Sequence, residues 1–92
     1  MSTTAEPFVC HGCRAKEAVI RAIKLLKREA HRKALCQTMY AYNLLCKADL
    51  NEDEHAALHL IDDALTMMAE TLQQTKIPKM VFRKLAMAVK LL

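Results

Sequence analysis

The chain has few of the residues that build β-sheets and tight turns. Of its 92 residues none is Trp, two are Tyr, two are Phe, one is Gly and two are Pro. Strands favour aromatic and β-branched residues and turns favour Gly and Pro, whereas the Ala, Leu, Met and Lys that are plentiful here are good helix formers. The composition therefore predicts an all-α fold, and the length is that of one domain with a modest core.

Long apolar runs are also missing. No stretch approaches the roughly eighteen apolar residues that a membrane span requires, and Met1 to Val9 has neither the basic start nor the apolar centre of a secretory signal. We therefore expect a soluble cytoplasmic protein that binds no membrane. In that reducing compartment the four cysteines are thiols or metal ligands more often than disulfides.

Motifs for catalysis are lacking as well. Gly12 is the only glycine, so there is no glycine-rich loop that could hold a phosphate. The carboxylates Asp62 and Asp63 lie on one short predicted helix, and no nucleophile with a neighbouring His and acid can be assembled from spacing. We expect a binding protein without a small-molecule substrate, not an enzyme.

Two segments are predicted along the chain. Residues 1–14 form an N-terminal tail that ends in a CxxC knuckle, where Gly12 supplies a positive backbone angle, and residues 15–92 form a single helical domain. Within it, Asn51 is a good N-cap and Glu54 follows three residues later, as in a capping box, so a new helix begins there. Pro78 marks the first turn of the last helix.

Apolar residues at helical spacing indicate which faces are buried. The middle helix buries Ala57, Leu58, Ile61, Ala64, Leu65, Met68 and Leu72, and the last one Val81, Phe82, Leu85, Val89 and Leu92. In the first stretch the apolar side changes, from Val19, Ile23, Leu26 and Ala30 to Leu35, Met39, Tyr42 and Cys46.

This change of side has two explanations. Either the stretch breaks near residues 31–34 into two helices, or one long helix buries different faces at its two ends. We favour the break, because so long a helix would protrude from a small domain. Either way the predicted fold is a small bundle of three or four helices, with Cys36 and Cys46 in its core as small apolar residues.

Charge is sorted by segment. Arg14 to Lys47 contains nine Lys/Arg and two acids, Asp49 to Thr75 contains seven acids and no Lys/Arg, and Lys76 to Lys90 contains five Lys/Arg and no acid. Such segregation creates faces of opposite sign, which attract phosphates or acidic partner surfaces.

The candidate binding residues are the cations of two helical stripes. On the first stretch they are Arg21, Lys24, Arg28 and Arg32, with Lys27 and His31 at the margins; on the last helix they are Lys76, Lys79, Arg83 and Lys90. A stripe of like charges repels itself unless something negative lies against it, and the phosphates of a nucleic acid would do so. The two stripes can frame one groove. The alternative is a solvated outer face, partly neutralised by the acidic middle helix.

A zinc site is a further candidate. Cys10 and Cys13 form a CxxC pair that can supply two of the four ligands of a zinc ion. His55 and His59 lie one helical turn apart, so both imidazoles can face one point and supply the other two. The alternative is a free-thiol knuckle and two surface histidines, because the two pairs are much further apart in sequence than in compact zinc fingers.

A resemblance adds to this interpretation. In length, in basic charge and in one run of residues the chain resembles small phage-encoded type I-F anti-CRISPR proteins; the run extends from Phe8 through Cys10-His11-Gly12-Cys13-Arg14 into Arg21, Lys24, Arg28 and Arg32. The resemblance implies a non-enzymatic inhibitor in the host cytoplasm that docks on an RNA-guided surveillance complex and blocks target DNA binding. The second hypothesis is a small DNA-binding transcriptional regulator, zinc-stabilised or not.

Overall fold

The computed structural model describes residues 11–72 and 76–92. They form α1 (His11–Lys27), α2 (His31–Cys46), α3 (Glu52–Glu70) and α4 (Lys79–Leu91), and this part of the chain contains no strand. The prediction of an all-helical bundle is confirmed, with four helices. Within the same residues, none of the helices is long and apolar enough to cross a bilayer.

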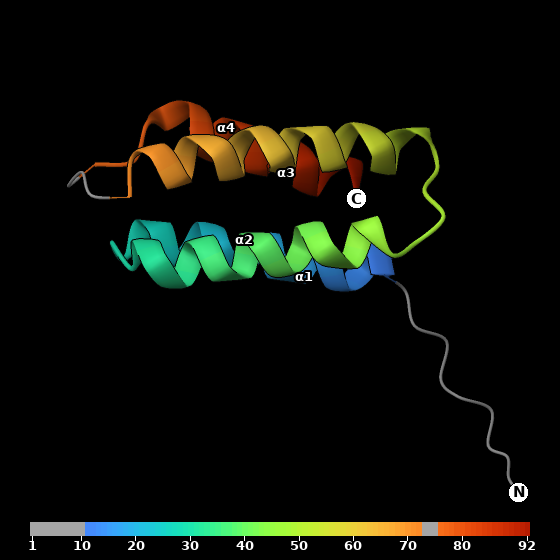
Figure 1. Ribbon diagram of the computed structural model, residues 1–92, viewed down its shortest axis with the longest axis horizontal. Helices are drawn as coiled ribbons and strands as arrows, with labels where there is room; N and C mark the ends of the chain where they lie inside the picture. The colour runs from blue at the N-terminus through green and yellow to red at the C-terminus, as the bar shows by residue number, and fades with distance from the viewer. Residues whose placement is uncertain (1–10, 73–75) are drawn as a thin grey trace, which may run out of the picture.

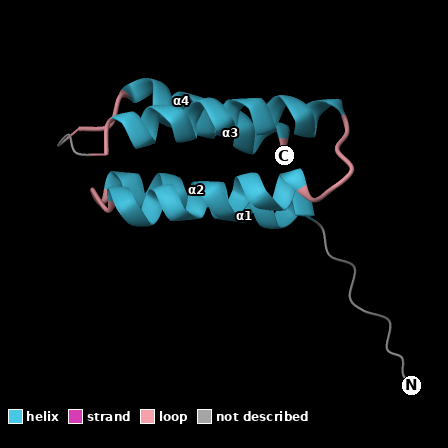
Figure 2. Ribbon diagram, in the orientation of Figure 1, coloured by secondary structure: helices cyan, strands magenta, loops and turns pink. Residues whose placement is uncertain are grey.

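The four helices are arranged as two hairpins, α1 with α2 and α3 with α4 (Figure 1). The hairpins lie on each other so that α2 packs on α3 and α1 packs on α4, and short loops connect successive helices (Figure 2). In this arrangement α1 has α2 and α4 as its neighbours, and α3 is diagonally opposite.

The first helical stretch is divided, as favoured, but the break lies at residues 28–30, a few residues before the predicted one. Glu29 has φ 63°, in the left-handed region. The Glu29 N–H donates to the Leu26 carbonyl at 3.0 Å and the Ala30 N–H to the Leu25 carbonyl at 2.9 Å. These two bonds form a Schellman motif, in which the left-handed position is usually Gly. The sequence gives no sign of this helix end, because Glu29 occupies the position where Gly is usual.

The predicted knuckle needs a correction at its second half. Gly12 and Cys13 belong to α1, which begins at His11 and not near residue 15, and Gly12 has no positive φ. Gly12 is instead buried where space is short, because a Cβ atom placed on it would lie 2.6 Å from Glu54 Oε2. Cys10 lies outside the described residues.

The beginning of α3 is as predicted. The Glu54 N–H donates to Asn51 Oδ1 at 2.8 Å, and the Asn51 N–H donates to Glu54 Oε1 at 3.0 Å. This is a complete capping box, and three acids in the first turn complement the positive end of the helix. Pro78 is the N-cap of α4, again at the predicted boundary.

The core contains mostly small side chains. Eight of the fifteen buried apolar residues are Ala, which allows the helices to approach closely. In α3 and α4 the predicted faces are largely confirmed, since Ile61, Met68, Val81 and Leu85 are buried.

The predicted face of α2 is confirmed only in part, because Leu35 and Tyr42 are half-buried against the core but Met39 and Cys46 are not. Its buried residues are Ala34, Thr38, Ala41 and Leu45, whereas Met39 is 49% exposed and Cys46 is exposed as well. The core therefore lies about one residue away from the expected stripe, because an Ala-rich face packs more closely than the bulkier one beside it. Cys36 is exposed too, so neither cysteine is in the core.

Candidate functional site

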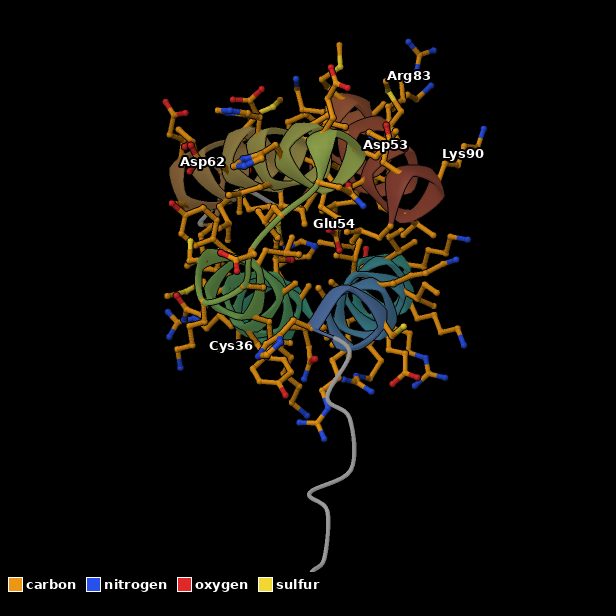
Figure 3. All side chains as sticks on the ribbon, turned by 90° about the vertical axis from the view of Figure 1, so that its right-hand side faces the viewer. Cys36, Asp53, Glu54, Asp62, Arg83 and Lys90 are labelled. Atoms are coloured by element: carbon orange, nitrogen blue, oxygen red, sulfur yellow. The ribbon has the colours of Figure 1, made fainter. Side chains whose placement is uncertain are left out.

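The tertiary arrangement gathers the basic helices together. Across α1, α2 and α4 the sequence has eleven Lys/Arg and one acid, whereas α3 has six acids and no Lys/Arg. Because α1 has α2 and α4 as its neighbours, the exposed cations of these three helices lie around it, with those of α2 confined to Arg32 and Lys33 in its first turn; we call this surface the basic face. The acidic α3 lies diagonally across from α1, as the end view shows (Figure 3).

The predicted binding residues are accessible. Nine of the ten are exposed and His31 is half-buried; the ten are Arg21, Lys24, Lys27, Arg28, His31, Arg32, Lys76, Lys79, Arg83 and Lys90. Among residues 11–72 and 76–92 the one ion pair joins Lys84 Nζ to Asp63 Oδ2 at 3.1 Å. None of the predicted cations forms an ion pair with an acid of the described residues.

Three of the predicted cations surround a shallow hollow of about 230 Å³ on α1. Arg21, Lys24 and Arg28 line it together with Leu25, and we call it the α1 hollow. Arg21 is held toward α2, since its Nε donates to Gln37 Oε1 at 3.2 Å. The arrangement offers several charged N–H donors to one small anion, which suits a phosphate group.

A second hollow, of about 290 Å³, lies at the corner where α1 ends and α4 begins. Lys27 at the end of α1, His31 at the start of α2 and Lys76 just before α4 all line it, so residues of both predicted stripes meet here. Its remaining lining is Leu26, Ile77, Phe82 and Glu29. We call it the corner hollow.

The other candidates are more dispersed. Arg32, Lys79 and Arg83 line neither of these two hollows. Arg83 and Lys90 point outward from α4 (Figure 3). They contribute to the charge of the basic face and line neither of the two hollows.

The predicted zinc ligands are not brought together in the part of the chain that the structure describes. There, no three His, Cys, Asp or Glu side chains are placed so that they could hold a metal ion. His55 and His59 are both exposed on α3, and Cys13 is on α1. Because Cys10 lies outside the described residues, the zinc site stays a prediction.

One side chain outside the basic face has a perturbed acidity. The pKa of Tyr42 is raised, first by a hydrogen bond with Cys46, then by the negative charges of the Cys46 thiolate and Asp62. These residues lie where α2 packs on α3, away from the hollows, and we assign them no role in binding.

Four residues that line the corner hollow, Leu26, Glu29, Ile77 and Phe82, are not among the predicted binding residues. Phe82 was expected in the core but is half-buried and lines the hollow, and Glu29 was not considered because nothing in the sequence marked the left-handed turn. The helical period places Phe82 beside the buried Leu85, so the sequence alone suggested only a packing role.

Compared with protein-family models, with curated proteins and with solved structures, the chain matches none.

Proposed function

We propose that this protein is a non-enzymatic inhibitor whose basic face docks on the phosphate backbone of a nucleic-acid-containing complex. The observation that carries the proposal is the position of α1 between two other basic helices, with the acidic helix diagonally across. Like charges so placed repel one another, and a polyanion that lies against them removes the repulsion and releases its own counterions.

The α1 hollow is the best place for a phosphate. Arg21 and Arg28 can each present a planar fork of N–H donors, and Lys24 adds a compact positive charge. Contacts of this kind position a protein on a backbone and carry no sequence information. The expected mode of binding is therefore electrostatic and largely independent of sequence.

The complex we favour as the partner is an RNA-guided surveillance complex, as the resemblance to type I-F anti-CRISPR proteins implies. A basic face docked on the guide RNA, or in the channel for target DNA, would block target binding without any chemistry. The alternative function, a DNA-binding regulator that acts on DNA itself, uses the same face.

The two functions differ in their affinity for naked duplex DNA, which fluorescence anisotropy can measure at several salt concentrations. Weak binding that is lost at physiological salt supports the inhibitor, and tight binding at that salt supports the regulator. A pull-down from host lysate with and without nuclease then tests whether a ribonucleoprotein is the partner.

A charge-reversal experiment tests the site. In the variant Lys24→Glu, Arg28→Glu, Arg32→Glu we expect a loss of nucleic-acid binding of about a hundredfold or more at low salt, with unchanged unfolding. The matched control is Arg14→Glu, Lys47→Glu, Lys90→Glu, which changes the net charge equally with exposed residues at the other end of the bundle. An equal loss in both variants would contradict a localised site.

A further inference from the structure

The corner hollow differs in chemistry from the rest of the basic face. Its apolar lining is Leu26, Ile77 and Phe82, and its charged lining includes Lys27 from the end of α1 and Lys76 from the segment before α4. Phosphate binding alone needs no apolar surface. A ligand that matches this hollow has a flat apolar part and negative charge on either side of it.

An unpaired nucleotide has this combination. Aromatic side chains stack on bases of single strands whatever their identity, because every base has a π-face, and neighbouring cations follow the backbone. Phe82 is half-buried, so its packing against the bundle holds the ring in place while part of it is accessible from the hollow. Lys27 and Lys76 are exposed and can reach the phosphates on the two sides of one base.

Glu29 places a negative charge at the corner hollow, which a site for phosphate alone would exclude. Its carboxylate repels phosphate, yet it lines the same hollow and makes no ion pair within residues 11–72 and 76–92. A carboxylate is a good acceptor for the amino group of a base, as in the pairing of Glu with cytosine N4. Uracil has no amino group, and its one donor on this edge, N3–H, lies between two carbonyl oxygens that repel a carboxylate, so uracil gains less.

The two hollows are neighbours on the same helix end. Arg28 lines the α1 hollow and Lys27, the residue before it in the chain, lines the corner hollow, so both hollows extend to the C-terminal end of α1. A single strand can therefore continue from one hollow to the other while cations accompany its backbone.

We infer that the corner hollow binds one unpaired nucleotide of a single-stranded nucleic acid, with its base on Phe82 and its flanking phosphates on Lys27 and Lys76. The carboxylate of Glu29 selects bases that carry an amino group. The inference rests on the proposed function, because the same basic face supplies the attraction for the backbone, and it adds a preference for single strands over duplexes.

The first test is binding of short oligocytidine, oligouridine and duplex RNA of equal charge to the intact protein at low ionic strength. We expect oligocytidine to bind about fivefold or more tightly than oligouridine, and duplex to bind more weakly than oligocytidine. An oligomer that contains 2-aminopurine should lose fluorescence on binding, because the base stacks on the Phe82 ring; this measurement needs no variant.

Two variants separate the contribution of the Phe82 ring from that of the Glu29 carboxylate. Phe82→Leu should weaken oligocytidine binding about five- to hundredfold and leave duplex binding unchanged, and Phe82→Tyr should restore it. Glu29→Gly removes the carboxylate at a position whose left-handed backbone suits glycine, and the preference for oligocytidine over oligouridine should disappear. Urea unfolding of each variant checks that the fold is intact.

The outcomes distinguish the two proposals. If all three nucleic acids bind equally and Phe82→Leu changes nothing, the nucleotide site is overturned while the basic face remains. If none of them binds even at low salt, both proposals fail together. Quenching of 2-aminopurine that persists in Phe82→Leu would place the base elsewhere and would also overturn the site.

Discussion

Gly12 and Glu54 meet at the point where α1 begins under the first turn of α3. Glu54 Oε2 would lie 2.6 Å from a Cβ atom on Gly12, while the other oxygen, Oε1, accepts the Asn51 N–H at 3.0 Å. The carboxylate thus closes the capping box of α3 and also lies at the positive N-terminal end of α1, whose own first turn has no acid. In the end view Glu54 is located between the two hairpins (Figure 3).

Gly12→Ala is expected to destabilise the protein although Ala is the better helix former. The new methyl group displaces the Glu54 carboxylate and breaks its bond to the Asn51 N–H, which outweighs the gain in helix propensity; the net loss should be about 0.5–1 kcal/mol. Urea unfolding followed by circular dichroism measures it.

The control for this prediction is the same substitution in a Glu54→Ala background. Without the carboxylate the methyl group fits, and Gly12→Ala should then stabilise the protein by a few tenths of a kcal/mol, ~0.5 at most. If Gly12→Ala changes stability in the same direction in both backgrounds, the contact with Glu54 is not the reason for glycine at position 12.

Glu29→Gly should stabilise the protein. Glu29 has φ 63°, a conformation that costs an L-residue with a side chain roughly 1 kcal/mol and glycine much less. We expect the free energy of unfolding to rise by about 0.5–1 kcal/mol. Glu29→Ala keeps a Cβ atom and serves as the control; if it stabilises as much as Gly, the backbone angle is not the cause.

Asn51→Ala should reduce the free energy of unfolding by about 1 kcal/mol, since the Glu54 N–H loses the acceptor that now lies at 2.8 Å. Asn51→Ser and Asn51→Asp keep an oxygen acceptor and should recover most of the loss. A thermal unfolding series of the three variants checks the order, and an Ala variant as stable as the parent would contradict it.

The raised pKa of Tyr42 predicts a pH effect at the alkaline end. The neutral phenol is favoured in the folded state, so this contribution to stability is fully present below pH 10.0, the ordinary pKa, and is lost as the pH rises through the folded value. In a Tyr40→Phe background, where Tyr42 is the remaining tyrosine, an ultraviolet titration follows it directly.

Cys46→Ala should lower the Tyr42 pKa toward 10.0, because it removes both the hydrogen bond and the thiolate charge. Asp62→Asn removes a smaller contribution and should have the smaller effect. A larger shift for Asp62→Asn than for Cys46→Ala would contradict the assigned cause.

Features of the fold that depend on residues close together in the sequence were easier to predict than features that depend on packing between helices. The capping box at Asn51 and the boundary at Pro78 are local, and both were predicted at the right residues. The turn at Glu29 is also local, but its glycine position holds a different residue, so the break was placed too late. At Asn51 and Pro78 the residue type that usually marks the start of a helix is present, whereas at Glu29 the usual Gly is absent.

The buried face of α2 shows the limit of periodicity. Larger apolar side chains such as Met39 and Tyr42 suggested one stripe, and the structure buries the neighbouring one with Ala34 and Ala41. The small Ala side chains let the helices approach closely, and this favours burial of the stripe that contains them. The effect acts only when the partner helices are in place. The candidate cations were predicted correctly as exposed, since Lys and Arg are seldom buried without a partner.

The amino-acid order alone determined that the chain is helical, where α3 and α4 begin, and that positive and negative charge occur on different helices, because propensities, caps and composition act within a few residues. Only the tertiary structure decided that α1 lies between the two other basic helices, and that Lys27, Glu29, Lys76 and Phe82 border one hollow. Residues 47 to 55 positions apart in the sequence meet there through the packing of two hairpins. No local rule specifies that packing.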